Sequence, residues 1–182
     1  MIQMREDASR EAAMQVAKKM MAAAMTAPKG CGLDFVRGAI ISGEEKDVLA
    51  GHMRDIAGET GEDFYARDAR NVDNSFCVLL LWTEDEPIQL TNCGLCGCTD
   101  CADNRAKGIS CAFNVTDLGI AVGSAVSVAA DNRIDNRVLF SAGKGAARME
   151  IFGDEIKVCY GIPLSVSSKS IFFDRGDGDV AF

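Results

Sequence analysis

The feature that most restricts the fold of this chain is an unbroken apolar run, Phe76-Cys-Val-Leu-Leu-Leu-Trp82, with polar residues on both sides. A short, continuous run is typical of a fully buried strand, because in a half-exposed strand apolar and polar residues alternate. The run therefore predicts a central β-strand. The chain has 182 residues, of which 48% are hydrophobic, and this is enough for one hydrophobic core around such a strand.

The segments on either side of this strand show helical spacing or shorter apolar runs, separated by Gly and Pro. Ser42-Gly-Glu-Glu45 has the form of a capping box, so we expect a helix to begin there and to end at Gly58. The other expected helices span 5–26, 62–72, 115–130 and 141–149, and the other expected strands span 35–41 and 156–162, where Pro163 ends the last strand. No internal repeat or domain boundary is visible, so residues 1–182 are expected to form a single domain.

The net charge, the first residues and the length of the apolar runs restrict the partners of the protein. A formal net charge of −8 argues against binding to nucleic acid or to anionic lipid. The first residues lack the basic start and apolar stretch of a secretory signal, so we expect a cytoplasmic protein. The longest nearly uncharged run, 118–130, is shorter than the roughly 20 residues of a membrane span, and it predicts a buried helix.

Five of the eight cysteines lie between Cys93 and Cys111, within a segment rich in Gly, Asp and Asn that matches no regular element. We call residues 90–113 the cluster loop. In the cytoplasm stable disulfides are disfavoured, so clustered cysteines indicate a metal or an iron–sulfur site. The spacing C-x2-C-x4-C-x9-C provides the four thiolates that a 4Fe–4S cluster needs. Its predicted ligands are Cys93, Cys96, Cys101 and Cys111.

The residues around these cysteines suit an anionic cluster. Gly94 and Gly97 permit backbone conformations that bring amide N–H groups close to sulfide atoms. Cys111 directly precedes the helix expected at 115–130, for which Asn114 is the predicted cap, and a helix N-terminus carries partial positive charge. Arg105 and Lys107 could offset more of the charge of the cluster.

Two alternatives remain for the group of cysteines, namely a zinc site and free or disulfide-bonded cysteines. The pairs Cys93/Cys96 and Cys98/Cys101 are formally zinc knuckles, although a single residue separates them and structural zinc usually draws on knuckles that stand apart. If zinc is bound, the protein would be a zinc-stabilised binding module without redox activity. Cys98 is either an inert thiol or a substitute ligand if Cys101 does not reach the cluster.

Several stretches together resemble an uncharacterised bacterial and archaeal family described as containing a ferredoxin domain. The matching stretches are Thr26-Ala-Pro-Lys29, Ser42-Gly-Glu-Glu45, Arg67-Asp-Ala-Arg-Asn-Val72, Asn92-Cys-Gly-Leu-Cys-Gly97, Cys111-Ala-Phe113, Asp117-Leu-Gly-Ile-Ala121, Gly123-Ser-Ala125, Asp135-Asn-Arg137, Gly161-Ile-Pro-Leu-Ser165 and Ile171-Phe-Phe-Asp-Arg175. The resemblance spans nearly the whole chain and implies the iron–sulfur cluster. It implies no particular substrate.

The order of elements is also similar to the flavin-dependent nitroreductase fold, with Ala27-Pro28 after the first helix and Gly161-Ile-Pro163 at the last strand. This likeness implies an α+β domain with a mixed or antiparallel central sheet flanked by helices, into which the cluster loop is inserted. It also implies a homodimer and, as an alternative, an FMN site bordered by Pro28 and Lys29. The Arg-rich segment that holds the flavin phosphate in that fold is absent here.

The resulting prediction is an electron-transfer protein that carries one 4Fe–4S cluster and exchanges single electrons with a redox partner protein. The first alternative is an FMN-dependent reductase fed by the cluster, and the second is the zinc module. If the protein is an enzyme, it is an oxidoreductase. No catalytic residue is identified, because His52 is the only histidine and no convincing Ser-His or Cys-His set exists.

Overall fold

The predicted apolar strand lies inside the sheet as β2, Cys77–Thr83, and all of its residues are buried. The computed structural model describes residues 2–84, 86–152 and 156–173. Its sheet has the order β1-β2-β4-β3, and every neighbouring pair is antiparallel. The other strands are β1 (Val36–Ile41), β3 (Asp135–Asn136) and β4 (Val158–Ser165). Since β2 pairs with β1 on one side and β4 on the other, the prediction of a central strand is confirmed.

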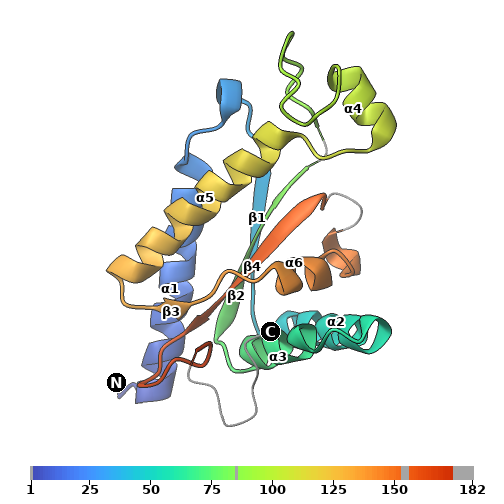
Figure 1. The fold of residues 1–182 in the computed structure, drawn as a ribbon. Coiled ribbons are helices and arrows are strands. Elements are labelled where there is room, and N and C mark those ends of the chain that lie inside the picture. Colours follow the sequence, from blue (N-terminus) through green and yellow to red (C-terminus); the bar gives the residue numbers. More distant parts are fainter. Residues whose placement is uncertain (1, 85, 153–155, 174–182) are drawn as a thin grey trace.

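Helices cover both faces of this sheet (Figure 1). Two lie on one face, α1 (Arg5–Thr26) and α5 (Ala112–Asp131), and three on the other, α2 (Glu44–Thr60), α3 (Asp63–Asp73) and α6 (Phe140–Ala146). Leu79 and Leu81 of β2 point into the first layer, whereas Val78 and Leu80 point into the second. This alternation follows from the two-residue period of a strand and explains why the run is apolar throughout. The expected single α+β domain is confirmed.

The segment between β2 and α5 projects beyond one end of the sheet (Figure 1). It contains a short helix, α4 (Cys101–Lys107), where the sequence had predicted irregular structure. The signals for this helix were an N-cap at Asp100 and a stop at Gly108, whose φ of +63° is favourable for glycine. Two single 3-10 turns, η1 (Gly30–Gly32) and η2 (Glu150–Phe152), complete the described elements.

Two predicted helix caps are wrong. The N-cap of α2 is Gly43, with a φ of +59°, so the chain enters the helix through a left-handed conformation and Ser42 lies one residue too early to cap it. The helix continues past Gly58 to Thr60. The N-cap of α5 is Cys111, and Asn114 lies inside the first turn, where its side chain donates to the Glu86 carbonyl at 2.7 Å.

Pro163 does not end the last strand, because β4 continues to Ser165 with Pro163 opposite Val78. The N–H of Gly161 donates to Leu139, on the side of β4 that faces away from β2. Pro163 stands two residues later, so its nitrogen faces the same side, where no named strand pairs with it. A proline is therefore tolerated without loss of a bond to β2. The last helix, α6, is also shorter than predicted and ends at Ala146.

Helix α5 is the one helix of the described residues that is long and apolar enough to cross a membrane by length and composition. Core helices pass the same test. Leu118, Ala121 and Ala125 of α5 are fully buried in the core that α5 shares with α1 and the sheet. In addition, the Ser124 hydroxyl donates to the Ala23 carbonyl of α1 at 2.9 Å. These contacts are those of a core helix.

Candidate metal centre

The first cysteines of the cluster loop lie on irregular backbone. Asn92, Gly94 and Gly97 have φ values of +108°, +63° and +81°, and the N–H of Gly97 donates to the Gly94 carbonyl at 2.9 Å. The predicted need for glycine at positions 94 and 97 is thus confirmed, because residues with a Cβ rarely adopt this conformation. The turn reverses the chain between Cys93 and Cys98.

Cys101 is the first residue of α4, and the start of that helix is fixed by a reciprocal cap. Asp100 accepts a hydrogen bond from the N–H of Asp103 at 2.8 Å, while the Asp103 carboxylate accepts one from the N–H of Thr99 at 3.1 Å. This pairing has the logic of a capping box with two aspartates. It holds the backbone on both sides of Cys101.

Cys111 reaches the same region from the other side as the N-cap of α5. The Cys111 side chain makes no hydrogen bond to the first turn of the helix, and the residue is only 8% exposed. A helix of 20 residues places partial positive charge at this end. A thiolate or an anionic group beside Cys111 is therefore favoured electrostatically.

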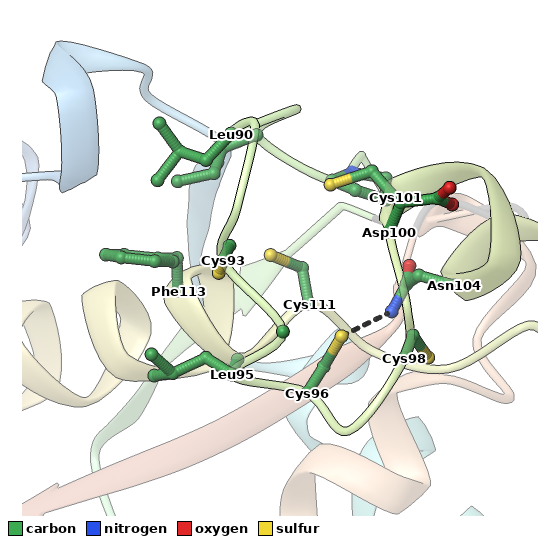
Figure 2. A pocket seen from close by; sticks show the side chains of 14 residues that line it. Leu90, Cys93, Leu95, Cys96, Cys98, Asp100, Cys101, Asn104, Cys111 and Phe113 are labelled. Atoms are coloured by element: carbon green, nitrogen blue, oxygen red, sulfur yellow. Dashed lines mark hydrogen bonds between the residues drawn. The ribbon is translucent and has the colours of Figure 1, made fainter.

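All five cysteines of the cluster loop line one small pocket. Apolar residues form much of the rest of its wall, namely Pro87, Ile88, Leu90, Leu95 and Phe113. In Figure 2 the side chains of Cys93, Cys96 and Cys111 point toward a common space, and Cys101 approaches it from α4. The sulfur of Cys98 points away from Cys111.

The distances between the cysteine side chains affect whether they could bind a single metal ion or an iron–sulfur cluster. Across the ranges 2–84, 86–152 and 156–173, no three His, Cys, Asp or Glu side chains stand close enough together to hold one metal ion. Four thiolates on one zinc ion must all lie about 2.3 Å from it. In a 4Fe–4S cluster each cysteine binds a different iron, so the thiolates surround a larger group. The two groups therefore require different separations between the four sulfur atoms.

Hydrogen bonds hold the sulfur of Cys96. The pKa of Cys96 is lowered chiefly because the backbone N–H of Cys98 donates to its sulfur, and the Asn104 side chain contributes in the same direction against burial. The Asn104 amide nitrogen lies 3.4 Å from the Cys96 sulfur. Cys98 behaves differently, since burial and the neighbouring Cys96 raise its pKa.

The two basic residues that were expected to offset the charge of a cluster both have acidic partners. Arg105 pairs with Glu86 across the base of the loop, and Lys107 pairs with Asp103 at 2.8 Å on α4 itself. Their charges are therefore largely neutralised locally. Backbone N–H groups and the α5 terminus are left as the main positive features around the pocket.

The three other cysteines lie outside the pocket. Cys77 and Cys159 are buried in strands β2 and β4, where burial raises the pKa of Cys77 to about 11 and that of Cys159 to about 12. Both are residues of the hydrophobic core. Cys31 is exposed in η1. His52 is partly buried on α2, with Asp55 at 3.8 Å as its acidic neighbour, and it does not line the cysteine pocket.

The residues predicted to border a flavin lie after α1. The Lys29 ammonium group donates to the carbonyls of Ala24 and Met25 at 2.8 and 2.7 Å, so it closes the C-terminus of α1. Because the Lys29 ammonium group is already bound to these carbonyls, it is less available to pair with a flavin phosphate. The next residue, Gly30, packs against the ring of Phe113, which lines the cysteine pocket. The segment that carries Pro28 and Lys29 therefore adjoins the pocket.

Asn104 is the residue of the site that sequence reasoning missed. It is 1% exposed and follows Cys101 by three positions, on the same face of α4. A separation of three residues brings Asn104 and Cys101 to one face only because residues 101–107 form a helix. The combination of Asp100, Asp103 and Gly108 was the signal that could have revealed this helix.

Comparison with known proteins gives two kinds of match. A family model described as "Uncharacterized protein containing a ferredoxin domain" matches residues 107–175. An uncharacterised protein of Archaeoglobus fulgidus is 36% identical to this chain over 171 residues, which cover 89% of this chain and 91% of that protein. The sequence match therefore extends over the sheet, the helices and the cysteine pocket alike.

Solved structures show the same fold at low sequence identity. A nitroreductase family protein from Clostridium novyi superposes with a TM-score of 0.58 at 15% identity, covering 84% of this chain and 73% of that one. A protein described as a nitroreductase from Desulfovibrio desulfuricans, solved in complex with FMN, gives 0.55 at 13% identity, with coverage of 86% and 75%. The predicted nitroreductase-like architecture is confirmed.

Proposed function

Because this chain belongs to the family of uncharacterised proteins containing a ferredoxin domain, we propose that it carries one 4Fe–4S cluster and transfers single electrons. The proposed ligands are Cys93, Cys96, Cys101 and Cys111. The observation that carries the proposal is that these four cysteines, which come from a glycine turn, the start of α4 and the N-cap of α5, line one pocket. When bound, such a cluster accepts or releases one electron at a time.

The residues of the chain have separate tasks in this proposal. The side chains of Leu90, Leu95 and Phe113 form apolar wall and limit the access of water, which affects the potential of a cluster. The α5 terminus at Cys111 stabilises negative charge. Leu95 is itself 66% exposed, so a redox partner protein could approach the pocket closely there. We expect exchange with such a partner in the cytoplasm.

The decisive assay measures iron, acid-labile sulfide, zinc and flavin together on protein prepared without oxygen. We expect iron and sulfide in equal amounts, about four of each per chain. Stoichiometric zinc without iron would establish the zinc module instead. Colourless protein without iron, sulfide or zinc, even after anaerobic reconstitution with iron and sulfide, would refute any cluster.

Serine variants of the four cysteines test the ligand set. Cys93→Ser, Cys96→Ser, Cys101→Ser and Cys111→Ser should each lose most of the iron or bind it more weakly, because serine supplies no thiolate. Cys31→Ser is the matched control, since Cys31 is exposed in η1 and lies outside the pocket. If Cys98→Ser abolishes iron while Cys101→Ser retains it, Cys98 is the ligand and Cys101 is not.

The second candidate is an FMN-dependent reductase in which the cluster supplies electrons to the flavin. It is favoured by one observation, namely that the segment after Pro28 packs through Gly30 against Phe113 of the cysteine pocket. The engagement of Lys29 with the end of α1 weighs against it. Flavin released when the anaerobic protein is denatured would support this candidate. Absence of flavin, together with no binding of added FMN, would remove it.

A further inference from the structure

The buried amide of Asn104 is held against one sulfur of the cysteine pocket. Its nitrogen lies 3.4 Å from the Cys96 sulfur, and the residue is 1% exposed. Its carbonyl oxygen has no hydrogen-bond partner among the residues that the structure describes, although it is buried. Leaving a buried oxygen without a hydrogen-bond partner is unfavourable. The amide of Asn104 is therefore oriented so that its N–H meets the Cys96 sulfur, although its oxygen then has no partner among the described residues.

The backbone of Asn104 is fixed on both sides. Its N–H donates to the Asp100 carbonyl at 3.1 Å, and its own carbonyl accepts from the N–H of Ile109 at 3.2 Å. The cap at Asp100 and the Gly108 turn thus clamp the helix that presents the side chain. Such a donor is preorganised, since little further ordering is needed for it to meet the sulfur.

We propose that Asn104 is a positioning residue that donates a hydrogen bond to the Cys96 sulfur and thereby raises the reduction potential of the bound cluster. This inference rests on the proposed function. Reduction adds one electron, and hence one negative charge, to the cluster and its sulfur ligands. A fixed N–H donor stabilises the more negative state more strongly, so the reduced form is favoured.

Asn114 offers a matched control within the same chain. It is 2% exposed, and its carbonyl oxygen is likewise buried without a partner in the described part of the chain. Its amide, however, donates to the backbone carbonyl of Glu86 at 2.7 Å and not to a sulfur. Replacing each asparagine by leucine therefore removes a similar buried amide, but only one of the two replacements removes a bond to Cys96.

The test compares wild type, Asn104→Leu and Asn114→Leu as anaerobically prepared, cluster-containing proteins. Each is equilibrated with dithionite-based redox buffer at the midpoint potential of the wild type, and the reduced fraction is read by electron paramagnetic resonance. The expected ratio of reduced to oxidised cluster is about three- to tenfold lower in Asn104→Leu, where tenfold corresponds to about 59 mV for one electron. Asn114→Leu should match the wild type.

A second measurement detects the hydrogen bond itself in the wild type. Wild type labelled with ¹⁵N in the asparagine side-chain amides should show a weak hyperfine coupling between one such nitrogen and the reduced cluster, which is lost in Asn104→Leu and persists in Asn114→Leu. No such coupling in the wild type, or an unchanged ratio in an Asn104→Leu protein with full iron and sulfide, would overturn the inference while the proposed function stands. Wild type without iron and sulfide would instead reject the proposed function itself.

Discussion

At the scale of single residues, the chemistry of each cysteine depends on what surrounds it. In the cluster loop, N–H donors lower the pKa of Cys96, whereas burial and the neighbouring Cys96 raise the pKa of Cys98. Cys77 and Cys159 meet hydrocarbon, and burial raises their pKa. Spacing in the sequence places Cys96 and Cys98 in the cluster loop and Cys77 and Cys159 outside it. Surroundings decide how each thiol ionises, because ionisation depends on solvation and on nearby donors.

The buried thiol of Cys77 predicts a loss of stability at alkaline pH. Its pKa is about 11 in the folded protein against an ordinary value of 9.0, so between these values the unfolded chain releases a proton that the folded chain keeps. The free energy of unfolding should therefore fall as pH rises above about 9, by at most about 1.4 kcal/mol per pH unit from this group. Urea unfolding between about pH 8 and pH 10.5, a range that spans most of this window, measures the slope.

Cys77→Ala should make this slope shallower, because the thiol that keeps its proton in the folded protein is then absent. Equal slopes for wild type and Cys77→Ala would show that the Cys77 thiol does not titrate differently on folding.

At the scale of secondary-structure elements, α6 lies very close to β4 at Gly143. A Cβ built on Gly143 would lie 1.8 Å from the carbonyl oxygen of Cys159. No side chain fits there, so glycine is required by packing although its helix would favour alanine. A Cβ built on Gly51 in α2 would meet nothing within 4 Å, so that glycine is free of this restriction.

The same substitution should therefore have opposite effects at the two positions. Gly143→Ala should lower the free energy of unfolding by about 1–3 kcal/mol or more, because α6 must move away from the sheet. Gly51→Ala should raise it by about 0.5–1 kcal/mol, since alanine has the higher helix propensity. Urea unfolding of both variants gives the comparison. A neutral Gly143→Ala would mean that α6 is held less closely to β4 than this contact requires.

At the scale of the whole molecule, a homodimer stays a prediction. Gly119, Gly123 and Ser127 form an exposed stripe along α5, and a Cβ at either glycine would meet nothing within 4 Å in the single chain. Small residues four apart would let the backbone of a second copy come close. We expect α5 to contribute to that contact.

Sedimentation velocity, which measures the oligomeric state in solution, tests this prediction. The wild type should sediment as a dimer, and Gly123→Gln should shift the equilibrium toward monomer because a long side chain separates the helices. Gly58→Gln is the control, since Gly58 is an exposed glycine of α2. A monomeric wild type, or equal behaviour of the two variants, would argue against a dimer formed through this stripe.

The elements whose signal is local could be predicted from the order of the residues alone. Helix α1 spans Arg5–Thr26 as predicted, and β2 lies at the centre of the sheet, because periodicity and continuous hydrophobicity are properties of neighbouring residues. The grouping of five cysteines and the need for Gly94 and Gly97 were equally visible, since turn conformation is a local property.

Only the tertiary structure decides which residues far apart in the sequence come into contact. Asn104 reaches Cys96, Lys29 closes α1, and Pro163 stays within β4, because each depends on partners that folding brings close or on which edge of a strand is free. The caps at Gly43 and Cys111 depend on the direction in which the chain enters each helix. Contacts between distant residues follow from how layers pack, and local spacing carries little information about that packing.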